Sequence, residues 1–285
     1  MRVVLTGASG QLGAYLLPCL ASSGHEVSSW CGLTTTNQMF LPIDLTDHVA
    51  TRSALDAARP EVVLHAAAMS SAEAVRRDPK LGYAINVEAT RTLADWCLVQ
   101  SVPMIFLSTD LVFDGDHAPY AEDDPTRPLL EYGRTKVAAE TIVAHVPDHL
   151  IARVSLLYGL NKCGRSNFFD KSILAIQSGQ PQTFFANEFR TPLHYQVAAE
   201  ILTRLVDQET RGVIHVAGQE RVSRYELMRR AVKSLGLNDA LVEANHWVET
   251  EHPERRPADV SLSTGRLEHL FPGANRLTIE ESLMC

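Results

Sequence analysis

Short apolar runs alternate with longer amphipathic stretches through the first half of the chain. Such runs are typical of strands that are buried on both faces of a sheet. Strands are predicted at residues 2–6, 26–30, 40–43, 61–67, 104–108 and 149–154, and helices at residues 12–22, 49–58 and 79–100. Because strands that alternate with helices form a parallel sheet covered on both faces, the pattern predicts an α/β protein with a doubly wound parallel sheet.

The alternation becomes less regular after about Tyr158. A loop is predicted at residues 160–166, helices at 168–177, 196–206 and 223–235, a strand at 213–217, and a charged, proline-containing loop at 251–257. We expect residues 1–158 to form a nucleotide-binding domain. Residues 159–285 are expected to form a smaller C-terminal substrate-binding lobe, with some segments that return to the main sheet. Ligands of such sheets bind at the carboxyl ends of the strands, where this lobe would close over them.

The first thirteen residues carry the strongest local signal. An apolar strand at residues 3–5 leads directly into Gly7, Gly10 and Gly13, and an apolar helical segment follows. Glycine allows a tight turn and a close approach of the backbone to a pyrophosphate, and the helix N-terminus offers N–H groups to that anion. The order of strand, glycine turn and helix predicts a dinucleotide-binding unit of the Rossmann type. The spacing is Gly-x-x-Gly-x-x-Gly, so a glycine-rich turn without a ligand is the alternative.

Composition narrows the class of protein. Of the 285 residues, 45% are hydrophobic and 21% are charged, as in an ordinary globular protein. The formal net charge of −8 argues against a nucleic-acid partner. No apolar run approaches the roughly 20 residues that span a bilayer, and the chain opens on a strand rather than a signal peptide. The five cysteines, Cys19, Cys31, Cys97, Cys163 and Cys285, are scattered without a Cys-x-x-Cys pair, which favours reduced thiols in the cytoplasm and no metal site.

A second candidate site begins at Tyr132, which is followed four residues later by Lys136. Side chains four apart on a helix share one face. A lysine cation close to a phenol favours the phenolate, so we expect the tyrosine pKa to fall toward the range of a general acid. Ser108 and Thr109 end a predicted strand, where a hydroxyl can hold a carbonyl oxygen opposite the tyrosine. For Tyr132 and Lys136 the alternative is a chance pair on an exposed helix face. For Ser-Thr-Asp the alternative is a turn whose side chains hydrogen-bond to its own backbone, in which Asp110 is structural.

Four ordered motifs resemble those of a known family. They are Thr-Gly-Ala-Ser-Gly-Gln-Leu-Gly at residues 6–13, His-Ala-Ala-Ala at 65–68, Ser-Thr-Asp-Leu-Val-Phe-Asp-Gly at 108–115 and Tyr-Gly-Arg-Thr-Lys at 132–136, with further matches at 86–88, 190–192 and 255–257. Over nearly the whole chain the sequence resembles the extended short-chain dehydrogenase/reductases, and among them most closely the dTDP-4-dehydrorhamnose reductase family. It also resembles a relative of that branch, the regulatory β subunit of methionine adenosyltransferase, at residues 114–115 and 157–159.

The resemblance implies roles for particular residues. Thr109, Tyr132 and Lys136 are expected to be catalytic, with Ser108 beside Thr109 at the carbonyl. The cofactor is expected to contact Tyr132 and Lys136 together with the residues of the glycine loop, of the segment after the third strand and of the alanine turn, which are Gly7, Ser9, Gly10, Gln11, Leu12, Gly13, Asp44, Leu45, Ala66, Ala67 and Ala68.

Three positions on the substrate side depart from the family's pattern. Leu111 and Met69 replace tyrosines of the family, and Leu156 replaces a tryptophan. Loss of the ring faces removes a stacking surface for a sugar or a base. Leu111 also cannot act as the acid that dehydratases of the superfamily carry at this position, which argues against a dehydratase. These residues do not argue against an epimerase. Arg256 is expected to reach a substrate phosphate, and an exposed loop arginine is the alternative.

The end of the second predicted strand bears on the cofactor. Residues 28–32, Ser-Ser-Trp-Cys-Gly, offer neither an acid nor an arginine to the ribose 2′ position, so we expect NADP, with NAD permitted. The leading hypothesis is an NAD(P)H-dependent reductase of a ketone, either a 4-keto nucleotide sugar or a related small carbonyl compound, with Tyr132 as proton donor. The alternative is a non-catalytic NADP-binding regulatory subunit of another enzyme. The sequence does not decide whether the protein forms a homodimer.

Overall fold

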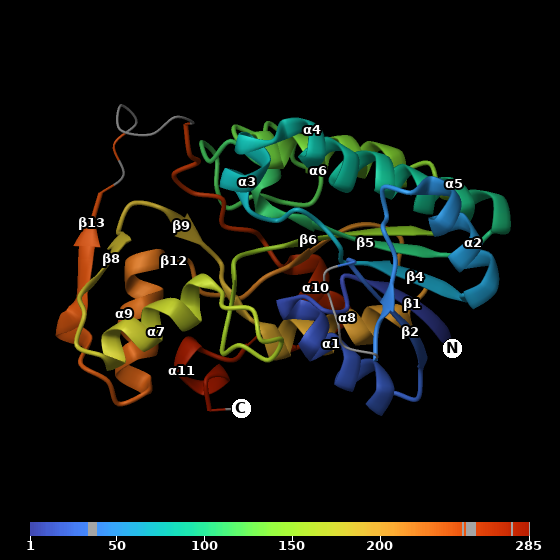
Figure 1. Cartoon of the computed structure of the whole chain (residues 1–285). Coiled ribbons are helices and arrows are strands. Elements are labelled where there is room, and N and C mark those ends of the chain that lie inside the picture. Colours follow the sequence, from blue (N-terminus) through green and yellow to red (C-terminus); the bar gives the residue numbers. More distant parts are fainter. Residues whose placement is uncertain (34–38, 247, 249–254, 275, 285) are drawn as a thin grey trace.

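The computed structural model describes residues 1–33, 39–246, 248, 255–274 and 276–284, and its centre is a seven-stranded sheet (Figure 1). Across the sheet the strands are β11 (Gly212–Val216), β6 (His149–Val154), β5 (Met104–Thr109), β4 (Val62–His65), β1 (Arg2–Thr6), β2 (Glu26–Cys31) and β3 (Leu41–Pro42). Every neighbouring pair is parallel, and the strand order reverses direction between β1 and β4. The predicted doubly wound α/β sheet is confirmed.

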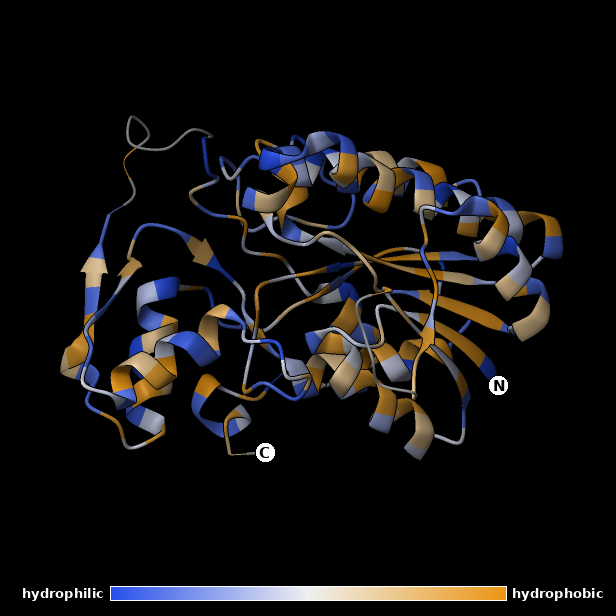
Figure 2. Cartoon of the chain, in the orientation of Figure 1, coloured by the Kyte–Doolittle hydropathy of each residue, from blue (hydrophilic) through white to orange (hydrophobic). Residues whose placement is uncertain are grey.

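Helices cover both faces of this sheet. On one face lie α1 (Gln11–Ser22), α8 (Tyr195–Val206) and α10 (Gly265–Leu270), and on the other lie α2 (His48–Ala58), α5 (Ala89–Gln100) and α6 (Glu131–Val143). Successive residues of a strand point to opposite faces, so Leu5 joins the core under α1 and Val4 joins the core under α5. Both side chains are fully buried. Figure 2 shows the strands as a mainly hydrophobic layer between helices with polar outer faces.

The helix predicted at residues 79–100 is present with an irregular start. It consists of α4 (Pro79–Tyr83), a π-helical turn η1 (Ala84–Glu88) and α5. π-helical turns are rare and frequently lie at functional sites. A short helix, α3 (Ala72–Arg77), precedes them, and the hydrophobic pattern did not predict it because six residues are too few for a periodic signal. The Ser71 hydroxyl caps α3, and the Asp78 carboxylate caps α4.

The C-terminal lobe has its own small core. Its elements are α7 (Phe168–Gln177), β8 (Gln182–Phe185), β9 (Phe189–Arg190), β12 (Val222–Ser223), α9 (Arg224–Ser234), a single turn η3 (Asp239–Leu241), β13 (Val242–Asn245) and α11 (Ile279–Ser282). β8 pairs in parallel with β13, and β9 pairs antiparallel with β12. Phe169 of α7 and Leu227 of α9 are fully buried between these elements.

The chain passes between the main sheet and the lobe more than once. β7 (Leu157–Tyr158) pairs with β10 (Leu193–His194), after which α8 and β11 return to the main sheet. The charged loop predicted at residues 251–257 is described only from Arg255 onward. Among the described residues, no helix is long and apolar enough to cross a membrane.

Candidate active site

The glycine loop lies against the turn that follows β4. Gly7 has a φ of +72°, and a Cβ at this position would stand 2.7 Å from the backbone nitrogen of Ala67. Only glycine allows both the conformation and the approach. Gly10 stands at the N-cap of α1, and a glycine has no side chain with which to occupy the first N–H groups of the helix. The predicted cofactor residues Gly7, Gly10, Ala66 and Ala67 therefore meet at the carboxyl edge of β1 and β4.

A chain of buried hydrogen bonds fixes this turn. The Thr6 hydroxyl accepts the N–H of Ala67 at 3.1 Å and lies 2.7 Å from Nδ1 of His65. On the other side of the ring, His65 Nε2 lies 3.0 Å from the hydroxyl of Thr90, which donates to the carbonyl of Asn86 at 2.8 Å. Since Thr90 already donates its hydrogen, we assign the proton of the neutral ring to Nε2. Burial lowers the pKa of His65 to about 3, so the ring stays neutral. Each hydrogen bond in this series therefore keeps the same donor and acceptor.

Other predicted cofactor residues surround the loop. The side-chain amide of Gln11 donates to Oδ1 of Asn161 at 3.3 Å and to the carbonyl of Arg165, which ties the glycine loop to the segment after β7. Leu12 packs against the core, and Leu45 does so on the opposite face. Asp44 is exposed and accepts hydrogen bonds from Thr46, which lower the pKa of its carboxyl.

The predicted catalytic residues converge at the same edge of the sheet. Thr109 is the last residue of β5, and Tyr132 and Lys136 lie one turn apart on α6. All three are buried, and Thr109 hydrogen-bonds to the phenol of Tyr132. The Lys136 ammonium stands 3.9 Å from the ring centroid of Phe106, and burial lowers its pKa to about 7.

The direction of the Tyr132 pKa shift differs from the prediction. The sequence predicts a fall caused by the nearby lysine. In the structure, burial raises the pKa of Tyr132, and the charge of Asp110 raises it further, while the bond from Thr109 opposes both. Burial disfavours the charged phenolate and outweighs the favourable contacts. The phenol is accordingly held in its protonated form.

Ser108 is engaged by a buried ion pair. Its hydroxyl donates to Oε1 of Glu140 at 2.5 Å. The same carboxylate accepts two hydrogen bonds from Arg153, at 3.1 Å from Nε and at 2.8 Å from Nη2, and both charged side chains are less than a tenth exposed. Glu140 lies two turns after Tyr132 on α6, and sequence reasoning did not single it out. Its position four residues after Lys136, on the same helix face, is the signal that was available.

The four predicted substrate residues lie in four different segments of the chain, and only Leu111 belongs to a helical turn. Leu111 is the second residue after the end of β5, and its N–H donates to Thr109 Oγ1 at 3.2 Å. The Met69 backbone is held by Asn86, which accepts its N–H at 2.8 Å and donates to its carbonyl at 3.2 Å. Leu156 packs against the core of the C-terminal lobe. The Arg256 guanidinium is 38% exposed and reaches Oε1 of buried Glu188 at 3.4 Å.

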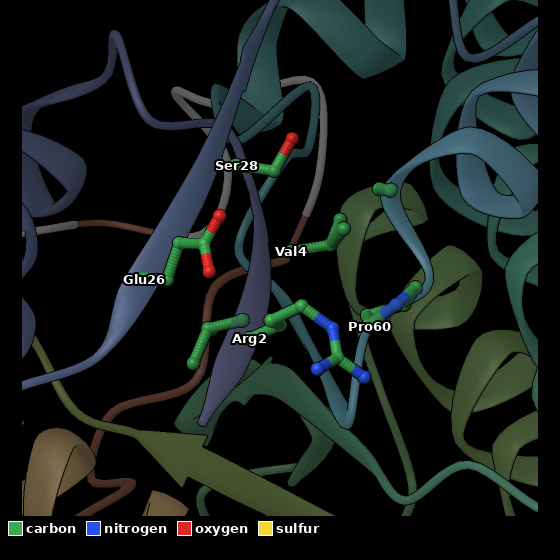
Figure 3. Close-up of a pocket in the computed structure, with 7 residues that line it drawn as sticks. Arg2, Val4, Glu26, Ser28 and Pro60 are labelled. Carbon is green, nitrogen blue, oxygen red and sulfur yellow. The ribbon is translucent and has the colours of Figure 1, made fainter.

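Two hollows in the surface differ in their relation to this edge. One of about 30 Å³ lies at the amino ends of β1 and β2, beside Arg2, Glu26 and Ser28 (Figure 3), and therefore at the edge opposite Thr109 and Tyr132. Ser28 lies within β2 and its hydroxyl accepts the indole N–H of Trp30 at 3.0 Å. A larger hollow of about 210 Å³ follows the catalytic strand and is lined by Asp114, His117, Tyr120, Asp124, Pro125 and Arg127.

Fold and site together define a Rossmann-like α/β protein with a threonine, a tyrosine and a lysine at the carboxyl edge of its sheet. The family model of the RmlD substrate-binding domain matches residues 1–282, and the chain belongs to that family.

Relatives of known name extend over the whole chain. The probable low-salt glycan biosynthesis reductase Agl14 of Haloferax volcanii is 29% identical over 99% of this chain and 96% of its own length. Methionine adenosyltransferase 2 subunit beta of Danio rerio is 28% identical over 94% of this chain and 84% of its own length. Among solved structures, a hypothetical dTDP-4-dehydrorhamnose reductase from Sulfolobus tokodaii is 30% identical and matches with a TM-score of 0.86 over 99% of both chains. The Bacillus anthracis enzyme in complex with NADP, 23% identical over 99% of this chain and 97% of that one, has the same fold with a TM-score of 0.86.

Proposed function

We propose that this protein is an NAD(P)H-dependent reductase that converts the ketone of a 4-keto nucleotide sugar, or of a related small carbonyl compound, into an alcohol. The observation that carries the proposal is the convergence of Thr109, Tyr132 and Lys136 at the edge that also holds the glycine loop. The similarity to reductases of the same family supports it.

The residues of the glycine loop fit a dinucleotide. Bare backbone at Gly7 and Gly10 and the uncapped N-terminus of α1 suit a pyrophosphate, and a Cβ at Gly7 would fill the space beside Ala67. We propose NADP as the preferred cofactor and NAD as an accepted one, because residues 28–32 place no carboxylate against a 2′-phosphate. Binding constants for NADPH and NADH, measured side by side by fluorescence, test this preference. Equal or tighter binding of NADH would contradict it.

Each catalytic side chain has a task in the reduction. When bound, the reduced nicotinamide supplies the hydride. Tyr132 donates a proton to the carbonyl oxygen as negative charge develops on it, and Thr109 orients the same oxygen once its hydroxyl hydrogen turns from Asp110 Oδ1 toward the ketone. A phenol whose pKa is raised by burial stays protonated at neutral pH and is ready to donate. Lys136, whose pKa is about 7, lies on the same helix face and stabilises the phenolate once the proton has left.

The decisive variant is Tyr132→Phe. It removes one hydroxyl and keeps the buried ring, so NADPH affinity is expected to stay unchanged while turnover of dTDP-4-dehydrorhamnose falls by at least about 100-fold, the usual contribution of general acid catalysis. Tyr83→Phe is the matched control, because Tyr83 is 47% exposed on α4. Turnover by Tyr132→Phe at the rate of the starting protein would refute the assignment. If the starting protein is inactive on this substrate, a panel of other 4-keto nucleotide sugars and simple ketones follows.

The second candidate is a regulatory subunit that binds NADP without turnover. The similarity to methionine adenosyltransferase 2 subunit beta over nearly the whole chain favours it. Tight NADPH binding, no turnover on the whole panel and stable co-purification with another enzyme would support this function over the reductase.

A further inference from the structure

A buried ion pair joins the C-terminal lobe to the catalytic strand. Arg190 belongs to β9 of the lobe, and Asp110 begins the single turn η2 (Asp110–Val112) directly after Thr109. Arg190 Nη1 lies 3.5 Å from Asp110 Oδ1, and the two side chains are 7% and 5% exposed. The pair therefore links the lobe to the residue that ends the catalytic strand.

The Asp110 carboxylate in turn orients the Thr109 hydroxyl. Its Oδ1 accepts that hydroxyl at 3.2 Å, and its Oδ2 accepts the hydroxyl of Ser155 at 2.9 Å. Thr109 Oγ1 also accepts the N–H of Leu111 and is hydrogen-bonded to Tyr132. The Asp110 carboxylate and the Tyr132 phenol therefore both lie within hydrogen-bond reach of the one Thr109 hydroxyl. Asp110 Oδ1 thus contacts the Arg190 guanidinium on one side and the Thr109 hydroxyl on the other.

We propose that Arg190 is a positioning residue for the proposed reduction, because it holds the Asp110 carboxylate where that carboxylate orients Thr109 toward the Tyr132 phenol. This role rests on the proposed function, in which Thr109 and Tyr132 are the reacting pair. Because Arg190 belongs to the C-terminal lobe, Asp110 has its paired positive charge only when the lobe is docked against the main sheet.

The charges around the phenol give the sign of the effect. The negative charge of Asp110 on η2 raises the pKa of Tyr132, and Lys136 lies one turn further along the helix of Tyr132. Asp110 faces Arg190 from β9 and Arg224 from the start of α9. Behind these two arginines, Glu188 pairs with Arg224 and Arg256. The positive charge of Arg190 opposes the field of Asp110 at the phenol. In Arg190→Gln the carboxylate loses its paired cation, so the phenol becomes harder to ionise.

The test measures ionisation at position 132 directly and needs no substrate. Tyr132 is replaced by difluorotyrosine, a more acidic phenol, in the full-length protein, and its ¹⁹F signal is followed against pH. In the Arg190→Gln background we expect the midpoint to rise by about one pH unit, the order of effect of one nearby charge. Arg190→Lys keeps the charge and is expected to return the midpoint toward its starting value. Arg221→Gln is the matched control, since Arg221 lies in the same lobe and pairs with Asp259.

An unchanged or lowered midpoint in Arg190→Gln would overturn the proposal. If that variant fails to fold, the double variant Asp110→Asn with Arg190→Gln removes both charges and leaves neither partner buried alone. Its midpoint is expected below the starting value, because the carboxylate that raises it is gone, and a midpoint at or above the starting value would also overturn the proposal. Loss of turnover in Tyr132→Phe tests the reductase, whereas this titration tests Arg190, so failure of one is distinguishable from failure of the other.

Discussion

Replacing Glu140 by glutamine is expected to destabilise the protein more than replacing any exposed charged side chain by a neutral one. The carboxylate accepts two hydrogen bonds from Arg153 and one from Ser108. Glu140→Gln puts an amide N–H₂ group against one of these donors and leaves the Arg153 charge, 6% exposed, without its carboxylate partner, although Nη1 still donates to the Glu122 carbonyl at 3.1 Å. Removal of one partner from a buried ion pair costs about 3–5 kcal/mol. That is a large share of the roughly 5–15 kcal/mol that stabilises a typical domain.

Urea unfolding followed by tryptophan fluorescence measures this loss as a lowered midpoint. The control is Glu73→Gln, which breaks the Glu73–Arg77 pair on α3, where the side chains are 67% and 75% exposed. An exposed pair contributes at most about 1 kcal/mol, so this control is expected to unfold almost like the starting protein. A loss below about 1 kcal/mol in Glu140→Gln would mean that Arg153 finds another partner, and the reasoning from burial would then be wrong. A second consequence is a further fall in the pKa of Lys136, because Glu140 raises it.

Three further predictions follow from local geometry. Gly7→Ala is expected to weaken NADPH binding and to lower stability more than Gly24→Ala, because both glycines have positive φ but only Gly7 is crowded by backbone; equal losses in a thermal melt would contradict this. Ser108→Ala is expected to lose about 1.5–3 kcal/mol of stability, the value of a hydrogen bond to a charged group, while its turnover falls less than tenfold. Stability is expected to fall as the pH drops from 6.5 toward 3, because His65 is protonated in the unfolded chain but not in the folded one. In His65→Asn this slope should flatten by about one proton, or 1.4 kcal/mol per pH unit, with the other buried histidines unchanged, and an equal slope would argue against the assigned chain of hydrogen bonds.

The parallel sheet and the placement of Thr109, Tyr132 and Lys136 at its carboxyl edge were predictable, because each depends on residues close in sequence. The run at residues 3–5 followed by Gly7 indicates a strand and its turn, and Tyr132 and Lys136 are neighbours on one helix. The partners of these residues were not predictable. Thr6 and His65 meet across adjacent strands, and Arg190 reaches Asp110 from another lobe, so no local pattern pairs them.

Burial explains the remaining difference. A sequence shows that Lys136 lies near Tyr132, which favours the phenolate, but it does not show how completely the phenol is removed from water. In the folded chain desolvation is the larger effect and reverses the direction of the pKa shift. The short strands β8, β9, β12 and β13 were missed because two to four residues give no periodic signal.

The return of β11 to the main sheet has a consequence for how the chain folds during synthesis. Within the described part of the chain β11 pairs with β6 alone, yet residues 155–211 are made between them. Until residue 216 has been synthesised, one edge of β6 keeps unpaired N–H and C=O groups, and such edges template pairing with other chains. Pairing over this separation also slows folding, because a long loop has to close first. Residues 1–158 therefore cannot complete the main sheet alone, and a nascent chain that stops within the lobe is a candidate for aggregation or for capture by a chaperone.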